Sequence, residues 1–550
     1  MAIVHKFNVT EDDYFDYALE YFNEQRLFDS LEMVGRCLDI DPDDFDFGML
    51  RARILYEMEL YEEALKQYYC LFLRYTAIPE LYLGLVQVFG ALGKPSKALY
   101  FLETLFEMDL QDDEEEYLES FREFDMKKFE ADIRVEPQMR LVEPGIEEYE
   151  AAQNHIRSAN FADAADNLVL VGKNSEYYSR SLIDRAIIEM SGGRYDSAIP
   201  LIDEAVKLEP YNVHFLLTKC MYFYLISNRE RFEELVCIID NLEITEVSDL
   251  LLVFNFAMEM KNHAWVVRYG EEVLMRKPYN RATIHFLMQA YYNLEEFVSA
   301  KEMLSLLIKI APNDYVVKYY TNIINNVNKS SLDYTLSLQK EDSVAVVEII
   351  IPDILKAEDF AEDLENRGGE LLLDWYFRQA RARDRRKIVA KLDEDFVGFL
   401  RMQLLSDTLS FGDKLAVLRK LLSLERRGRR DYALCVGDEI AEHDPRPPRY
   451  VEVSSAAVRL YLDLYASLSL LGCVNDVRFN RFFKRALATP EFKLPGKTQV
   501  TAFMAAFYHK YLAEDDEELT FEDICALFDV AGPKVEAQLK NLEGLGNYKY

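Results

Sequence analysis

Hydrophobic residues recur at three- and four-residue spacing along most of the chain, a pattern that predicts amphipathic helices. Residues 179–212 show it most clearly, with Leu182, Ile183, Ala186 and Ile187 on one face of a first helix. Two glycines, Gly192 and Gly193, interrupt that helix. A second helix then runs over Ala198, Ile202, Ala205 and Leu208, and Pro210 ends it. The stretch therefore predicts two helices joined by a tight turn.

Segments with the same pattern lie on both sides of this stretch. In the central part they are residues 144–177, 213–246, 247–280 and 281–314, followed by one more predicted helix over 315–327. Near the N-terminus, Ser30, Ala64 and Ala98 lie 34 residues apart at positions where two helices approach closely. This unit resembles the tetratricopeptide repeat, whose period is 34 residues. The resemblance implies an all-α fold, a solenoid of stacked helix pairs.

The pattern divides the chain into five parts. We expect an N-terminal array of about three repeats over 1–110, and an acidic linker or degenerate repeat over 111–143. A central array of about five repeats with a capping helix follows over 144–327. Residues 328–450 form a more basic helical region, and 451–550 form a C-terminal helical module.

The region after residue 328 loses the repeat and is predicted element by element. Residues 340–356 are ambiguous between helix and strand, because Val and Ile dominate them. Basic amphipathic helices are predicted over 371–392 and 396–424, and five more helices over 454–471, 476–487, 498–512, 520–528 and 533–542. Residues 432–436 and 439–443, separated by Gly437 and Asp438, predict the one small β-hairpin.

Composition narrows the class of protein. Half of the 550 residues are hydrophobic, so the chain is expected to be globular, and its net charge of −34 favours neither nucleic acid nor an anionic membrane as a partner. The seven cysteines are dispersed, which suits reduced thiols packed as small hydrophobic residues. We see no secretory signal and no apolar run long enough to span a bilayer, so a cytoplasmic location is expected.

The sequence contains no motif for a catalytic or metal site. The seven histidines are far apart, and none stands in H-E-x-x-H or beside a cysteine at zinc-ligand spacing. There is also no G-x-S-x-G, no G-x-G-x-x-G and no phosphate loop. We therefore expect no enzyme activity and no cofactor.

The resemblance implies a binding surface instead. In tetratricopeptide proteins the first helix of each repeat lines the concave face, where its side chains meet an extended peptide. Placed on the central array, that pattern gives the expected partner-binding residues Tyr149, Gln153, Arg157, Ile183, Ile187, Met190, Leu217, Met221, Tyr224, Leu251, Asn255, Met258, His285, Gln289, Tyr292 and Asn293. The lysine set with which chaperone-binding members hold a terminal carboxylate is not found at these positions.

The chemistry of these side chains suits an extended chain. Gln153, Asn255 and Gln289 each offer a hydrogen-bond donor and an acceptor, as a peptide backbone does. Methionine and tyrosine add adaptable apolar contact. The expected function is a non-catalytic scaffold or adaptor that binds an extended peptide or helix of another protein, of unknown identity. The alternative interpretation is that each of these residues packs against a neighbouring repeat or faces solvent.

The alternative function is a nucleic-acid-associated or transcription regulator. Two arginine clusters could contact phosphates, through Arg381, Arg383, Arg385, Arg386, Arg429 and Arg430. They could instead dock on the acidic arrays of the same chain or form one solvated helix face. Residues 521–542 weakly resemble a helix-turn-helix, and with residues 500–508 the last helices of a cyclin-like unit. The would-be recognition helix has only Lys534, Gln538 and Lys540 to read bases, which favours a packing module.

Overall fold

The computed structural model describes residues 10–75, 78–106, 108, 144–425, 431–436, 439–443, 455–471, 476–488, 492–496, 499–512 and 520–542. The chain divides into two compact units. The first comprises Met1–Arg122, Lys309–Tyr319 and Leu338–Tyr550, and the second comprises Glu123–Ile308 and Tyr320–Ser337. The predicted acidic linker, 111–143, lies outside the described residues.

The first unit begins with three antiparallel helix pairs. They are α1 (Glu11–Asn23) with α2 (Leu27–Ile40), α3 (Phe45–Glu57) with α4 (Tyr61–Phe72), and α5 (Pro79–Ala91) with α6 (Pro95–Phe106). Small residues lie fully buried where the paired helices meet, among them Ala18, Ser30, Ala52, Ala64 and Ala98. The hydroxyl of Ser30 donates to the carbonyl of Ala18 at 2.7 Å, which is possible only because the two backbones approach closely.

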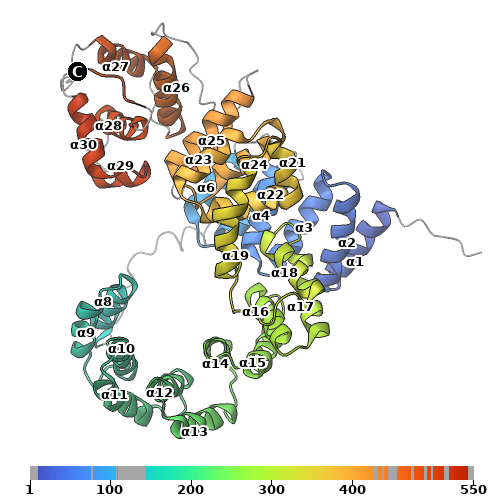
Figure 1. The fold of residues 1–550 in the computed structure, drawn as a ribbon, viewed down its shortest axis with the longest axis vertical. Helices are drawn as coiled ribbons and strands as arrows, with labels where there is room; N and C mark the ends of the chain where they lie inside the picture. Colours follow the sequence, from blue (N-terminus) through green and yellow to red (C-terminus); the bar gives the residue numbers. More distant parts are fainter. Residues whose placement is uncertain are drawn as a thin grey trace, which may run out of the picture. The chain divides into compact units, whose positions relative to one another are not determined.

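The second unit contains five further helix pairs. These are α8 (Ile146–Arg157) with α9 (Phe161–Leu170), α10 (Tyr178–Ser191) with α11 (Tyr195–Leu208), α12 (Val213–Leu225) with α13 (Arg229–Asp240), α14 (Val247–Glu259) with α15 (His263–Arg276), and α16 (Arg281–Asn293) with α17 (Phe297–Ile310). They follow one another along an arc, with α10, α12 and α14 on its inner side (Figure 1). Helix α18 (Tyr315–Asn326) follows the last pair; its residues up to Tyr319 belong to the first unit and those from Tyr320 on to the second.

One backbone feature recurs in every described pair. The turn between the two helices contains a residue with positive φ: Gln25, Glu59 and Gly93 in the first array, and Ala159, Gly193, Ser227, Lys261 and Glu295 in the second. Within each array these positions are 34 residues apart. The next N–H bonds to the carbonyl five residues back, as Arg194 does to Glu189 at 2.9 Å, and so closes the first helix. Period, helix pairing and turn together define a tetratricopeptide-type repeat fold.

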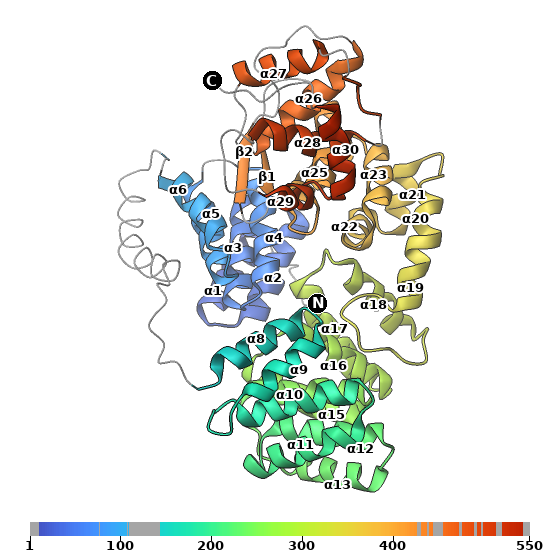
Figure 2. The ribbon, with the colours of Figure 1, turned by 90° about the vertical axis from the view of Figure 1, so that its left-hand side faces the viewer.

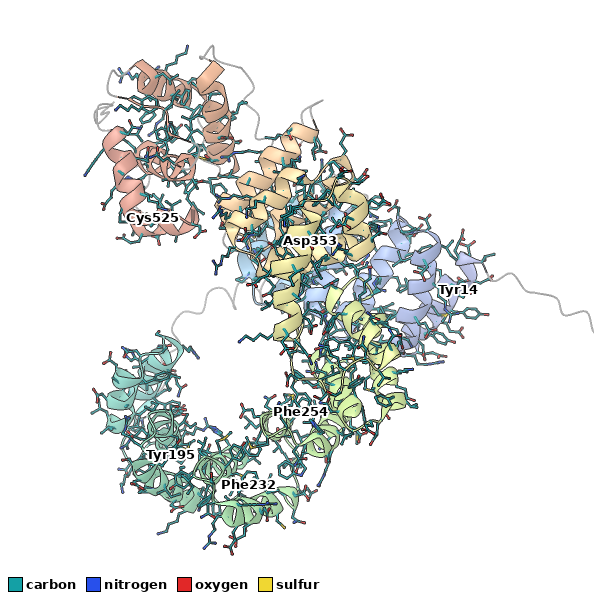
Figure 3. All side chains as sticks on the ribbon, in the orientation of Figure 1. Tyr14, Tyr195, Phe232, Phe254, Asp353 and Cys525 are labelled. Atoms are coloured by element: carbon teal, nitrogen blue, oxygen red, sulfur yellow. The ribbon has the colours of Figure 1, made fainter. Side chains whose placement is uncertain are left out.

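Aromatic and aliphatic side chains fill the space between the helices of the second unit. Phe254, on the inner helix α14, lies in a buried cluster that extends from α12 to α16, and Phe232 of the outer helix α13 packs against it (Figure 3). Tyr195, at the start of α11, packs beside Ala186 and Ala198. Burial of these faces in the clusters leaves the opposite faces of α10, α12 and α14 on the inner side.

All elements of regular secondary structure in residues 340–424 are helical. They form α19 (Lys340–Ala345), a π-helical turn (Val346–Ile350), α20 (Ile351–Ile354), α21 (Phe360–Arg367), α22 (Gly369–Gln379), α23 (Ala382–Lys391), a 3-10 turn (Glu394–Phe396), α24 (Val397–Leu405) and α25 (Phe411–Leu424). The ambiguous run 340–356 is therefore helix. The two helices predicted over 371–392 and 396–424 are each split, because Arg381 and Ser410 are extended residues that begin new helices.

The predicted β-hairpin is confirmed. Strands β1 (Tyr432–Val436) and β2 (Glu439–His443) are antiparallel, with Leu434 opposite Ala441. The hairpin lies beside α6 (Figure 2). The remaining helices are α26 (Ser455–Leu470), α27 (Asp476–Ala488), α28 (Val500–Leu512), α29 (Phe521–Leu527) and α30 (Gly532–Asn541), close to the five predicted.

Candidate functional site

The inner face of the central array is built by one helix from each repeat. Because the helices repeat with the same period as the turns, Gln153, Ile187, Met221, Asn255 and Gln289 occupy equivalent positions on α8, α10, α12, α14 and α16. The residue three positions further on is Ile156, Met190, Tyr224, Met258 or Tyr292 in the respective repeats. We call the surface formed by these five helices the inner face.

In the fifth repeat, two side-chain amides bind a non-helical segment of the same chain. Gln289 donates to the carbonyl of Thr335 at 2.8 Å and accepts from its N–H at 3.3 Å. Asn293 donates to the carbonyl of Leu332 at 2.8 Å and accepts from its N–H at 2.6 Å. The N–H and C=O of one residue point the same way only in extended backbone. Each amide therefore takes the place of a neighbouring strand.

Tyrosines hold both ends of this segment, Lys329–Ser337. The hydroxyl of Tyr292 donates to the carbonyl of Lys329 at 2.5 Å and accepts from its N–H at 3.3 Å. At the other end, the hydroxyl of Tyr320 on α18 receives a hydrogen bond from Gln289 and donates to the carbonyl of Ser337 at 3.2 Å. Backbone groups at four positions are thus matched by side chains of α16 and α18.

One side chain of the segment is anchored as well. Tyr334 packs against the core cluster beside Phe286, and its hydroxyl lies 2.7 Å from Nδ1 of His263. Burial raises the pKa of Tyr334 and lowers the pKa of His263, so both are neutral at pH 7 and share one hydrogen bond. Leu332 is buried too.

The predicted partner-binding residues of the fifth repeat therefore have an occupant already. Gln289 has 0% of its surface exposed, and His285 and Tyr292 are also buried. The ring of His285 lies edge-on to Tyr320, 4.9 Å between centroids. The mode of contact is that expected for an extended peptide, but residues 329–337 of the same chain make it. Nothing periodic in their sequence could have indicated this.

A polar cluster lies on the inner face at the other end of the array. Gln153 donates to the carboxylate of Asp184 at 2.7 Å, and Tyr149 bonds to the same carboxylate while stacking on Tyr177. Burial raises the pKa of Asp184, although these two hydrogen bonds oppose the rise. His214 lies near it, and burial lowers the pKa of His214. The cluster offers amide, phenol, imidazole and carboxylate groups within one short stretch of the face.

The other predicted residues differ in exposure. Arg157, Ile187, Tyr224 and Asn255 are exposed, and Leu251, Met221 and Met258 are half-buried. Ile183, Met190 and Leu217 are buried, and here the expectation of a partner contact is wrong. Ile183 packs with Leu182, Ala205 and Phe215, because its side of α10 faces α11 and α12. Met190 packs in the same way against Ala186 and Tyr222.

The arginine cluster of α23 is largely used inside the fold. Arg385 forms a two-point ion pair with Asp413, at 3.0 and 2.6 Å, and also donates to the carbonyls of Phe377 and Ala380 at the end of α22. Arg386 pairs with the second oxygen of Asp413 at 3.2 Å. Arg385 therefore stabilises the fold and is not available to phosphates. Arg381 and Arg383 are exposed, while Arg429 and Arg430 lie outside the described residues.

The helix-turn-helix-like end is a packing module in this structure. Ile524, Phe528 and Val535 are buried, and both α29 and α30 pack against α28. Gln538, one of the three candidate base-reading residues, is buried as well. Lys534 and Lys540 are exposed.

A charge cluster in the first unit, at the edge of the buried region, was not predicted. Lys97 of α6 bonds to Asp407 at 2.6 Å, Lys94 bonds to the same carboxylate, and Cys435 of β1 lies 3.1 Å from it. Lys414 donates to the carbonyl of Cys435. Since these residues are far apart in sequence, no local pattern could have joined them.

Two features are absent from the part of the chain that the structure describes. Among those residues there is no group of three or more His, Cys, Asp or Glu side chains placed to hold a metal ion. No helix there has both the length and the apolar character needed to cross a bilayer.

No protein-family model matches the sequence, and no curated protein matches it either. The similar solved structures include the TPR2AB domain of yeast Sti1 in complex with an HSP90 peptide (14% identity, 49% of this chain and 98% of that chain, TM-score 0.20). Yeast Tom70 is similar over 96% of both chains, at 11% identity and a TM-score of 0.26. Naa15, solved with Naa10 and HypK, is 11% identical over 97% of this chain and 70% of that chain, with a TM-score of 0.24.

Scores this low carry no weight for function. The assignment to the tetratricopeptide-type fold rests on the chain's own helix pairs and on the positive-φ turn that recurs every 34 residues within each array. It is an all-α repeat protein, and the residues that the structure describes include one β-hairpin.

Proposed function

We propose that the protein is a non-catalytic scaffold that binds an extended segment of another protein on the inner face of its central array. One observation carries the proposal: Gln289 and Asn293 of α16 each hold both backbone groups of an extended residue. In the fifth repeat, the inner face therefore binds extended backbone of the same chain.

The other repeats present related chemistry at the positions equivalent to Gln289. Gln153 and Asn255 place amides there, on α8 and α14, and Ile187 and Met221 place apolar groups between them. Tyr224, 52% exposed, and the half-buried Met258 lie one turn away. Amide, thioether and phenol groups bind a peptide rather than react with it, which supports a binding role.

Affinity capture from the source cell tests the proposal. The wild-type chain is compared with a Gln153→Ala, Asn255→Ala variant and with a control, Lys207→Ala, Met275→Ala, whose residues are exposed on the outer helices α11 and α15. We expect the inner-face variant to lose a protein that the wild type and the control retain. Equal capture by all three would show that the inner face is not the binding surface.

A further inference from the structure

The segment Lys329–Ser337 is held mainly through its backbone. Side chains of α16 and α18 bond to the backbone of Lys329, Leu332, Thr335 and Ser337. Backbone contacts of this kind do not depend on the identity of the residues bound. Any extended chain of similar shape could form the same hydrogen bonds.

Two side chains give the site its selectivity. Leu332 is buried, and Tyr334 is inserted beside Phe286 with its hydroxyl on His263. Asp333, between them, pairs with Lys261 at 3.2 Å, but both side chains are about three-quarters exposed, so this ion pair adds little. The site therefore contacts the sequence Leu-Asp-Tyr-Thr through the leucine side chain, the tyrosine side chain and the backbone of the threonine.

The rest of the segment is loosely attached. Ser330, Ser331 and Leu336 are exposed, and no helix or strand includes residues 328–339. A stretch with few buried side chains and no secondary structure opens at a lower free energy than the packed repeats around it. It is bound as a ligand is bound, at a few points, and not as a core element.

We propose that Lys329–Ser337 is an intramolecular ligand, and that its site on α15, α16 and α18 takes in its place a partner segment of the same class: an extended chain with an aliphatic residue and, two positions later, a tyrosine. The inference rests on the proposed function, since it treats the inner face as the peptide-binding face, and it names the chemistry of the peptide. The tethered segment acts as a built-in competitor.

The tether determines how strongly the segment Lys329–Ser337 competes with a partner segment. A short flexible tether gives an effective concentration on the order of millimolar. If the segment occupies its site about 99% of the time, a competing peptide binds with an apparent Kd raised about 100-fold. Release of the segment removes that factor without any change in the site itself.

A fluorescently labelled nonapeptide with the sequence of residues 329–337 tests this, by anisotropy with the full-length chain. The release variant is Leu332→Ser, Tyr334→Ser, which removes both buried anchors. We expect it to bind the peptide at least about tenfold more tightly than the wild type does. Adding Gln289→Ala and Asn293→Ala to the release variant should abolish binding, and a peptide with serine in place of leucine and tyrosine should not bind.

Equal affinity of the wild type and the release variant, or no binding by a release variant with wild-type circular dichroism, would overturn the proposal. If the release variant does not fold, hydrogen exchange on the wild type decides. Excess unlabelled peptide at millimolar concentration should speed exchange at the amides of Leu332 and Thr335, and unchanged exchange would count against exchange of ligands at this site. Neither readout involves Gln153 or Asn255, so the proposed function can stand if this inference fails.

Discussion

Lys97 and Asp407 are 310 positions apart in the sequence, yet their charged groups meet at 2.6 Å in the first unit. Lys97 is 1% exposed and Asp407 is 40% exposed, so the pair lies at the edge of the buried region. Burial alone would raise the pKa of Asp407, but hydrogen bonds from Lys94 and Lys97 outweigh it and hold that pKa well below its usual range. The carboxylate therefore stabilises the contact between α6 and the start of the loop before α25.

Replacing this carboxylate gives a pH-dependent prediction. Asp407→Asn leaves Lys97 buried without its charge partner, and we expect a cost of about 2–3 kcal/mol at pH 7, discounted for the exposure of Asp407. Because the folded pKa is lowered, the stabilisation is present above the unfolded pKa of about 4 and is lost as pH falls through the folded value. The difference in Tm between wild type and variant should therefore shrink below about pH 4. A difference that stays constant down to pH 2 would contradict the ion-pair interpretation.

Local patterns predicted most of the fold, and long-range contacts explain what they missed. The helix pairs could be predicted because the spacing of hydrophobic residues marks each helix and glycine or proline marks its end, as in residues 179–212. The pairing of Lys97 with Asp407 has no local signal, since its two halves lie in different elements.

In the candidate site, too, some features could be predicted from local patterns and others could not. Positions such as Gln289 and Asn293 follow from the repeat, and so does their ability to hold an extended chain. Ile183 lies in the core between α10, α11 and α12 instead of facing a partner, and its sequence context could not distinguish the two, because an isoleucine on an apolar helix face suits either. That residues 329–337 would fill the fifth repeat depends on the path of the chain after α18, which no spacing encodes.

Arg385 should contribute to stability, in contrast to its neighbour Arg383. Its guanidinium pairs with the buried Asp413 and also closes the end of α22. Arg385→Ala leaves that carboxylate with only Arg386, and we expect a loss of about 3–5 kcal/mol, as for other broken buried pairs. Arg383→Ala, at an exposed position, should change stability by no more than about 0.5 kcal/mol. Thermal unfolding of both variants measures this, and equal Tm values would refute the assignment.

The positive-φ turns supply a matched pair of substitutions in the central array. Ala159 has φ 55° and Gly193 has φ 73° at the equivalent position of the next repeat. A Cβ at Gly193 would meet nothing within 4 Å, so Gly193→Ala adds backbone strain alone. We expect Gly193→Ala to lower stability by about 1 kcal/mol and Ala159→Gly to raise it by about 0.5–1 kcal/mol.

Thermal unfolding of these variants gives the measurement. Ser158→Gly is the control, because Ser158 has φ −85° and gains nothing from glycine. If Ala159→Gly lowers Tm as Ser158→Gly does, the turn is not strained.

Gln289 gives the last prediction, on how the intramolecular segment is held. Its amide is fully buried and is the acceptor for the N–H of Thr335. Gln289→Ala removes the acceptor of that N–H and the group that donates to the hydroxyl of Tyr320. We expect this to lower the free energy that holds the segment by about 1–3 kcal/mol. Since about 1.4 kcal/mol corresponds to a factor of ten, hydrogen exchange over residues 329–337 should accelerate about ten- to a hundredfold. Asn255→Ala, an exposed amide at the equivalent position of α14, should leave that exchange unchanged. Unchanged exchange in Gln289→Ala would mean that Leu332 and Tyr334 hold the segment without the amides.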